Sequence, residues 1–233
     1  MKAKELIKKL SLSPSDFERI RQAVKDAEMR TSGEIALAAV PESADYSFRE
    51  LLAATLLGAV SFALLLPAHA RIEALLNRAF WHVPAWAVTL VIGGLPFLLV
   101  AAFFLVANVP ALDRKVIPAA EKTKAVYGRA LRHFVESGVY ATEGRTGILI
   151  FISYMEREVR VIADTGISKK IAQVEWDGIA RTVAEGVKAN KAADALCEAV
   201  ADCGELLAQH FPVSEETPGN ELPDGLVVLE AGA

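Results

Sequence analysis

Two long uncharged apolar stretches constrain the fold of this chain more than any other feature of its sequence. The first covers residues 51–70, and the second covers residues 83–112, with its most apolar part at residues 87–109. As a helix, about 20 residues span about 30 Å, which is the thickness of the hydrocarbon core of a bilayer. Each stretch is therefore long enough to cross a membrane.

A helical hairpin buried in the core of a soluble protein is the alternative. Neither stretch has a polar face, and two such helices need a larger core than a chain of 233 residues can wrap. Hydrophobic residues make up 53% of the chain, which is also high for a soluble protein. Trp81 and Trp86 flank the second stretch, where aromatic rings favour the headgroup layer. We therefore predict a transmembrane hairpin at about 51–70 and 87–109, with the lipid bilayer as a partner.

The distribution of lysine and arginine predicts the orientation of this hairpin, because cytoplasmic loops carry an excess of these residues. The connecting loop, residues 71–82, holds Arg71 and Arg78, whereas residues 114–132 after the second crossing are rich in both types. The first ten residues are basic but lack the apolar core of a secretory signal peptide. We expect a multi-pass protein of the plasma (inner) membrane, with both termini and the soluble domain in the cytoplasm.

The segments on either side of the hairpin carry helix and strand signals. Ser15 and Glu18 have the spacing of a capping box, and apolar residues at helical spacing predict a helix to about Met29. A buried strand follows at residues 34–41. After the hairpin, the patterns predict a helix at 117–137, strands at 146–153 and 159–164 joined as a β-hairpin, and amphipathic helices at 176–187 and 192–209.

The first strand thus meets its companions only after the membrane segment, which indicates one domain split by an insertion. Residues 1–47 and 113–212 form the domain, residues 48–112 form the transmembrane hairpin, and residues 213–233 form a flexible tail. Alternation of strands and amphipathic helices predicts an α/β fold, a three-layer α/β/α sandwich with a small mixed sheet of three or four strands.

Several segments resemble the TPM domain family. They are the strand that begins at Glu34, the helix through residues 127–134, and above all residues 145–167, RTGILIFISYMEREVRVIADTGI. Residues 210–212 and the tail motif at 220–224 are similar to bacterial membrane members. The resemblance covers about residues 15–224 apart from the membrane insert.

The resemblance implies an α/β/α sandwich, in agreement with the patterns above. It leaves the function open, because some organellar TPM domains are described as acid phosphatases connected with photosystem repair. Others are described as metal-binding or as accessory subunits of membrane complexes. Family membership therefore names no reaction.

Strand-end carboxylates are the candidate site. Glu34 begins the first strand, Glu143 precedes the second, and Asp164 ends the third, with Arg145 nearby. Such oxygens could bind a hard cation, Ca²⁺ or Mg²⁺, and Arg145 could bind an anion. Glu143 and Asp164 are neighbours in the β-hairpin, whereas the place of Glu34 depends on strand order. The alternative is a set of solvated strand-end charges with one salt bridge.

Other chemistries find little support. A net charge of −4 gives no basic face for nucleic acid. Residues 164–166, Asp-Thr-Gly, match the tripeptide of aspartic proteases, but a charged helical segment follows in place of a β-rich barrel. The sequence has no P-loop and no histidine pair with ligand spacing. Cys197 and Cys203 point apart on a helix, so we expect no disulfide between them.

Two function hypotheses follow, and no catalytic residue is identified. The first is a membrane-anchored TPM-like domain that acts as a non-catalytic accessory or binding module for another membrane protein or complex. The second is a metal-assisted, acid phosphatase-like hydrolase of phosphate monoesters that uses Asp164 and Glu143.

Overall fold

A computed structural model describes residues 2–107, 117–213, 219 and 221–231 of the chain. These residues divide into two compact units, one formed by residues 1–44 and 119–233 and the other by residues 45–118. The end of the expected second crossing, residues 108–109, and the cations Arg114 and Lys115 lie outside the described residues.

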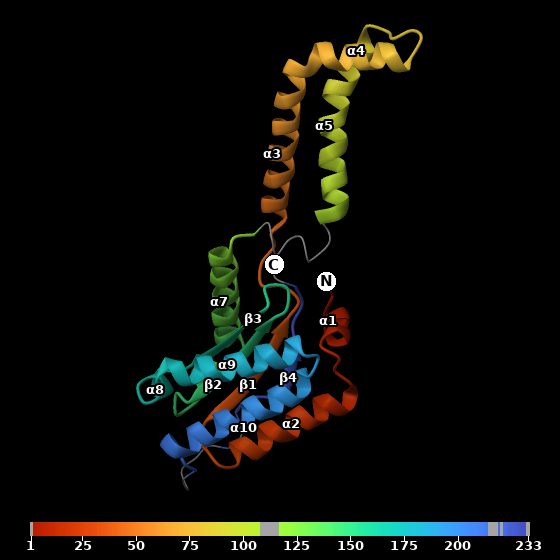
Figure 1. Ribbon diagram of the computed structural model, residues 1–233. Helices are drawn as coiled ribbons and strands as arrows, with labels where there is room; N and C mark the ends of the chain where they lie inside the picture. The colour runs from red at the N-terminus through yellow and green to blue at the C-terminus, as the bar shows by residue number, and fades with distance from the viewer. Residues whose placement is uncertain (1, 108–116, 214–218, 220, 232–233) are drawn as a thin grey trace. The chain divides into compact units, whose positions relative to one another are not determined.

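The first unit is built around a four-stranded mixed sheet in the order β3-β2-β1-β4 (Figure 1). The strands are β1 (Glu34–Val40), β2 (Gly147–Ser153), β3 (Glu158–Ala163) and β4 (Leu226–Val228). Strands β2 and β4 run parallel to β1, whereas β3 is antiparallel to β2. Residues of β1 and β2 are almost all buried, as expected for strands covered on both faces.

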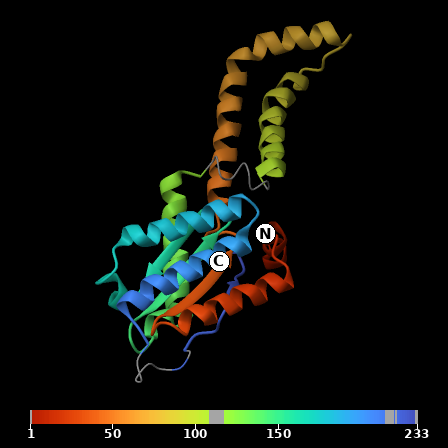
Figure 2. The same cartoon turned by 60° about the horizontal axis from the view of Figure 1, so that its bottom comes forward.

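Helices cover both faces of this sheet. One face packs against α1 (Ala3–Lys9), α2 (Pro14–Glu28), α9 (Gln173–Lys188) and α10 (Ala192–His210). The other face packs against α7 (Ala119–Glu136) and the short 3-10 helix η2 (Val139–Ala141). Figures 1 and 2 show the sheet between these two layers. The predicted α/β/α fold with a mixed sheet is therefore confirmed.

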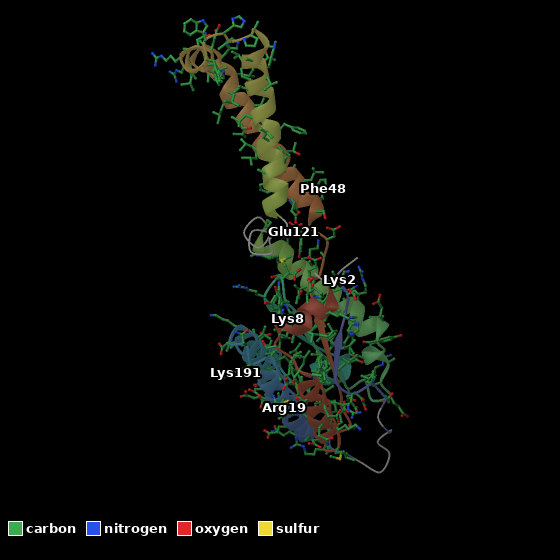
Figure 3. All side chains as sticks on the ribbon, turned by 90° about the vertical axis from the view of Figure 1, so that its right-hand side faces the viewer. Lys2, Lys8, Arg19, Phe48, Glu121 and Lys191 are labelled. Atoms are coloured by element: carbon green, nitrogen blue, oxygen red, sulfur yellow. The ribbon has the colours of Figure 1, made fainter. Side chains whose placement is uncertain are left out.

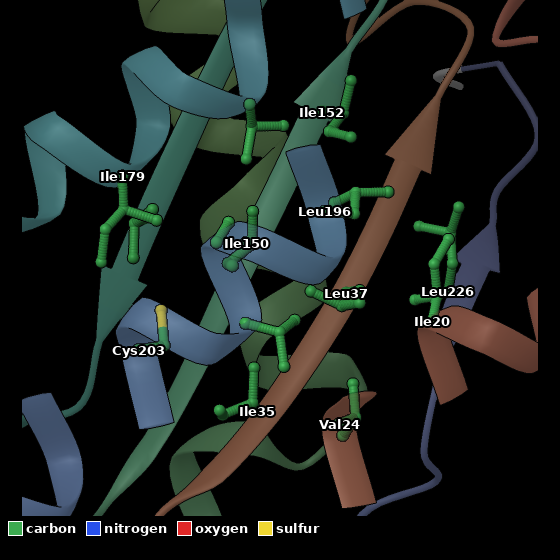
Figure 4. Close-up of a cluster of buried hydrophobic side chains, with 14 of the residues drawn as sticks. Ile20, Val24, Ile35, Leu37, Ile150, Ile152, Ile179, Leu196, Cys203 and Leu226 are labelled. Carbon is green, nitrogen blue, oxygen red and sulfur yellow. The ribbon is translucent and has the colours of Figure 1, made fainter. Parts of the chain in front are cut away.

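Strand alternation explains why the core divides into two parts. Successive side chains of a strand point to opposite faces of a sheet. Ile35 and Ile150 face α10, beside Leu196 (Figure 4), whereas Leu149 and Phe151 face α7. Trp176 is 2% exposed and belongs to the first core, where it is a packing residue.

The start of α2 differs from the expected capping box. The cap is Ser13 rather than Ser15, and the reciprocal partner is Asp16 rather than Glu18. The Asp16 N–H donates to Ser13 Oγ over 3.2 Å, and the Ser13 N–H donates to Asp16 Oδ2 over 2.9 Å. Pro14 explains the shift, because proline suits the first helical position, where no N–H partner exists.

Both ends of the chain contribute more structure than the sequence indicates. Residues 213–233 are expected to be a flexible tail, yet Leu226–Val228 pair with Leu37–Ala39 as the edge strand β4. Leu226 is buried, so the short apolar run fills space beside β1 that would otherwise be open to water. At the other end, Leu6 and Leu10 of the α1 region are buried in the first core.

A buried polar network holds the end of β1. Ser43 and Ser153 share a hydrogen bond of 2.6 Å between their hydroxyls, and Ser153 Oγ donates to Glu156 Oε2 over 2.6 Å. The Ser43 N–H donates to Glu156 Oε1 over 2.9 Å. Glu156 lies in the turn between β2 and β3, so this network ties that turn to the residues that follow β1.

The second unit consists of helices that carry the two apolar stretches. They are α3 (Ser47–Leu65), the 3-10 helix η1 (Leu66–Ala68), α4 (His69–Ala79) and α5 (Trp86–Ala107). Two helical segments, Ser47–Ala79 and Trp86–Phe103, are long and apolar enough to cross a membrane. Their most apolar windows are only 6% and 17% buried, so these helices are not the core of the described protein. Figure 3 shows side chains along them pointing outward, with Phe48 labelled.

Small residues let α3 and α5 approach each other. Ala54 and Gly58 are the buried residues of α3, and Val88 and Ile92 of α5 are also buried. A Cβ atom added to Gly58 would lie 2.7 Å from Cγ2 of Val100. Close contact through glycine and alanine is typical of helix pairs in membranes, where packing rather than the hydrophobic effect drives association.

Gly147 gives a test of the sheet packing. A Cβ there would lie 2.1 Å from the carbonyl oxygen of Val139, and backbone cannot move aside as a flexible side chain can. We expect Gly147→Ala to destabilise the first unit by on the order of 2–3 kcal/mol. The thermal unfolding midpoint of the full chain in detergent should fall by about 5–10 °C.

Gly128→Ala is the matched control for this substitution. Gly128 lies inside α7, and an added Cβ would have nothing within 4 Å. Because glycine is a poor helix former, this variant should be more stable by about 0.5–1 kcal/mol. An unchanged midpoint for Gly147→Ala would contradict the close approach of η2 to β2.

Candidate functional site

The strand ends with acidic residues meet at one edge of the sheet. Glu34 begins β1 opposite Gly147, and its N–H donates to the carbonyl of Thr146 over 3.1 Å. The Asp164 N–H donates to the carbonyl of Gly147 over 2.9 Å. Neighbouring strands are about 4.8 Å apart, so the backbones of Glu34 and Asp164 lie on the order of 10 Å apart across β2. The parallel pairing of β1 with β2 thus places Glu34 at the edge that holds Asp164.

Asp164 combines deep burial with incomplete hydrogen bonding. It follows β3 and caps α8 (Thr165–Ser168), and its Oδ1 accepts from the Thr165 N–H. The residue is 5% exposed, and its Oδ2 has no hydrogen-bond partner within the described part of the chain. A buried carboxylate oxygen without a partner is costly and therefore rare, so it marks a place where a ligand could bind.

Arg145 lies in the loop that packs against this turn. It adopts the left-handed backbone conformation, with φ of 53°, and its side chain is exposed. A Cβ added to Gly166 would lie 2.5 Å from the Arg145 carbonyl oxygen, so only glycine allows the loop to sit on the Asp164 turn. No ion pair joins Arg145 to Glu34 or Asp164 among the described residues.

Glu143 contacts the C-terminal tail through its backbone. Its side chain is exposed, and its N–H donates to both carboxylate oxygens of Glu221 over 3.2 Å. The structure therefore brings Glu34, Asp164 and Arg145 to one sheet edge and uses Glu143 to hold the tail. Across the ranges that the structure describes, no three His, Cys, Asp or Glu side chains are grouped so that they could hold a metal ion.

A second group of carboxylates, the tail cluster, adjoins Glu34. It consists of Glu28, Glu34, Glu221 and Asp224. The Ile35 N–H donates to Glu28 Oε1 over 2.9 Å, and the Leu222 N–H donates to Glu34 Oε2 over 3.3 Å. Lys25 Nζ lies 3.6 Å from Asp224 Oδ2. These contacts fasten the segment before β4 to α2 and to the start of β1.

Burial changes the acidity of two members of the tail cluster. Burial raises the pKa of Glu28 to about 8, and the nearby carboxylates of Glu34 and Asp224 add to this effect, while the hydrogen bond from Ile35 opposes it. Burial also raises the pKa of Glu34, helped by the charges of Glu221 and Asp224 and opposed by N–H donors of Glu221 and Leu222. At neutral pH Glu28 therefore carries a proton most of the time.

The pattern of the sequence does not indicate the tail cluster. Glu28 has the appearance of an ordinary charge in the last turn of a helix, and Glu221 and Asp224 lie in a polar stretch without periodicity. The only local signal is the short apolar run after Gly225, which has φ of +98° and turns the chain into β4.

Glu28→Gln tests the tail cluster through the pH dependence of stability. The pKa of Glu28 is raised on folding from 4.5 to about 8, so between these values the folded chain holds a proton that the unfolded chain has released. The contribution of protonated Glu28 to the free energy of unfolding is fully present below pH 4.5. It is lost as the pH rises toward 8, by up to about 1.4 kcal/mol per pH unit. The glutamine variant lacks this loss.

Thermal unfolding in detergent between pH 5 and 9 measures the difference. The midpoint of Glu28→Gln should rise relative to that of the unmodified chain as the pH increases. Glu185→Gln, an exposed position on α9, is the control and should follow the unmodified chain. If the midpoints of all three proteins change with pH in parallel, the pKa of Glu28 is not raised.

Comparison with known proteins agrees with this architecture. The family model of the TPM domain matches residues 105–206, which include α7, β2, β3 and α9. The chain is also similar to the NMR structure of the BA42 protein from the psychrophilic bacterium Bizionia argentinensis, with a TM-score of 0.55 and 16% sequence identity. That similarity covers 94% of this chain and 95% of the BA42 chain, and it supports a shared fold alone.

Comparison with curated proteins finds no match. The resemblance that residues 145–167 carry is nevertheless confirmed by the family match, which spans the whole β-hairpin and the helices on either side of it. Residues 105–206 of the chain therefore match the TPM domain family.

Proposed function

We propose that this protein is a membrane-anchored TPM module that binds another membrane protein as a non-catalytic accessory subunit. The observation that carries the proposal is an exposed apolar row on α7, the outer stripe, formed by Tyr127, Leu131 and Val135. These residues are four positions apart, so they follow one another along one side of the helix.

The outer stripe plays no part in the core of the first unit. The inner side of α7 uses Val126, Ala130 and Phe134 to cover β2 and β3, and these three residues are buried. Tyr127, Leu131 and Val135 remain 52%, 41% and 50% exposed. A solvent-exposed apolar row that does not contribute to the core is typical of a docking surface for an amphipathic helix.

Gly128 widens the surface on which a partner helix could lie. It is exposed, and an ideal Cβ at this position would meet nothing within 4 Å. A helix that docks along the outer stripe can therefore approach the α7 backbone closely at this point. A partner helix with an apolar face of similar length fits the stripe best.

Leu131→Glu tests the binding role. We expect proteins that co-purify with the full chain from mild detergent to lose at least tenfold in yield when a charge is placed in the outer stripe. Val174→Glu is the matched control, because Val174 is 68% exposed on α9, which covers the opposite face of the sheet. Equal recovery with both variants, or no partner with the unmodified chain after cross-linking, would exclude the accessory role.

The proposed location is the plasma (inner) membrane, with α3 and α5 crossing and the first unit in the cytoplasm. Arg71 and Arg78 are the cations of α4, between the crossings, whereas α7 carries Lys122, Lys124, Arg129 and Arg132 after the second crossing. This asymmetry follows the positive-inside rule.

Reporter fusions test the orientation. A reporter active only in the cytoplasm should be active at both termini and inactive when inserted at Asn77 in α4. The opposite pattern would reverse the orientation and leave the two crossings intact. Activity at all three positions would show that the hairpin does not cross.

A second candidate is a metal-assisted phosphomonoesterase, and the buried unpaired Oδ2 of Asp164 favours it. Asp164 and Glu34 would hold Ca²⁺ or Mg²⁺, cations that bind carboxylate oxygens and that can complete their coordination with water. When bound, the cation would polarise a phosphoryl oxygen, and the exposed guanidinium of Arg145 could bind the remaining anionic oxygens.

Hydrolysis of a chromogenic phosphate monoester, with and without Ca²⁺ or Mg²⁺, distinguishes the two candidates. For the enzyme we expect a cation-dependent rate that Asp164→Asn lowers at least a hundredfold, while Glu185→Gln, at an exposed position on α9, leaves the rate unchanged. Rates at background for the unmodified chain under all conditions would exclude the phosphatase and favour the accessory module.

A further inference from the structure

Helix α4 has the composition of an amphipathic helix at the turn of the apolar hairpin. Its apolar residues, Ile72, Leu75, Leu76 and Ala79, follow the spacing that places side chains on one face. The remaining surface carries the polar side chains of the helix, with Arg71 and Arg78 along one flank of the apolar face and Asn77 opposite to it. Helix α4 thus differs from α5 and from α3 beyond its first turn, which have no charged side chains and no polar face.

The position of α4 follows from the length of α3. Helix α3 has 19 residues, which give about 28 Å at 1.5 Å per residue, close to the hydrocarbon thickness of a bilayer. The 3-10 helix η1, which contains Pro67, then changes the direction of the chain. Figure 1 shows α4 running across the ends of α3 and α5 instead of continuing α3. The chain therefore turns where a crossing would be complete.

The apolar face of α4 is turned toward the side on which the spanning helices lie. Ile72 and Leu76 are half-buried, and α4 contacts α5. Leu75, on the same face, is 67% exposed. The apolar face of α4 thus adjoins α5, and Arg71 and Arg78 flank this face.

Aromatic residues extend this surface into the connection to α5. Phe80, Trp81 and Trp86 are 62%, 106% and 63% exposed, so most of each ring is uncovered in the described part of the chain. Tryptophan at such positions is characteristic of the boundary between lipid and water, because the ring is apolar and its N–H prefers a polar partner.

We propose that α4 is an interfacial helix that lies in the headgroup layer of the bilayer crossed by α3 and α5. Its apolar face enters the boundary of the acyl chains, and Arg71 and Arg78 reach the phosphate groups of the lipids. This inference rests on the membrane location proposed above. The occupant of the apolar face is lipid, because that face adjoins α5 and its flanking charges include two cations suited to phosphate.

Quenching of a fluorescent label by spin-labelled lipids tests this position. The full chain carries Cys197→Ser, and Cys203 stays unlabelled because it is fully buried. A single NBD label is attached at Leu75→Cys or Ala79→Cys on the apolar face, at Asn77→Cys on the polar face as the matched control, or at Leu98→Cys near the middle of α5. The protein is reconstituted in 3:1 phosphatidylcholine–phosphatidylglycerol vesicles that contain lipids with doxyl groups at carbon 5 or carbon 12.

We expect labels at residues 75 and 79 to be quenched at least threefold more than the label at residue 77, and more by the shallow doxyl group than by the deep one. The label at residue 98 should be quenched more by the deep group. Quenching at residue 98 with equal, weak quenching at 75, 79 and 77 would overturn the interfacial helix and leave the spans intact. No quenching at residue 98 would overturn the membrane location itself.

A second copy of the chain is the other occupant that the experiment detects. A blue shift of the labels at residues 75 and 79 that depends on protein density in the vesicles, without quenching by either doxyl lipid, would show protein contact in place of lipid. That result would overturn the proposal. Two labelled positions on the apolar face keep the test decisive if one variant fails to fold.

Discussion

The pairing of β1 with β2 is the interaction on which the rest of the first unit depends. The two strands are parallel and in register from Glu34 opposite Gly147 to Val40 opposite Ser153, although residues 41–146 separate them in the chain. Parallel strands need a crossover connection, and here the connection contains an entire second unit. The entropic cost of closing a loop grows only with the logarithm of its length, so an insertion of this size is tolerated.

The same pairing creates the acidic edge. Because β1 and β2 point the same way and β3 returns beside β2, the start of β1 and the end of β3 lie at one edge of the sheet. Glu34 and Asp164 are buried there, and the tail adds Glu221 and Asp224. Burial is the main cause of the raised pKa of Glu28, and the nearby carboxylates of Glu34 and Asp224 add to it. The opposite edge is held by neutral hydroxyls and Glu156, so the two edges differ in chemistry.

Regular elements with a strong pattern could be predicted from the sequence, and contacts between distant short segments could not. Strand β2 could be predicted because Gly147–Ser153 is a continuous run of apolar and β-branched residues. Helix α10 could be predicted because its apolar residues follow helical spacing. Strand β4 has three residues, too few to show a period, and its pairing depends on the free edge of β1. The raised pKa of Glu28 could not be predicted either, because only the folded tail brings Asp224 close to it.

The network of Ser43, Ser153 and Glu156 has a consequence for the order in which the protein is made. Strand β1 leaves the ribosome long before β2, and at roughly 5–20 residues per second the intervening chain takes on the order of ten seconds to synthesise. During that interval the backbone N–H and C=O groups of β1 lack β2 as a partner, and Ser43 cannot yet meet Ser153 or Glu156. The sheet of the first unit can therefore be completed only after all of the second unit has been synthesised, so the second unit has the opportunity to fold first.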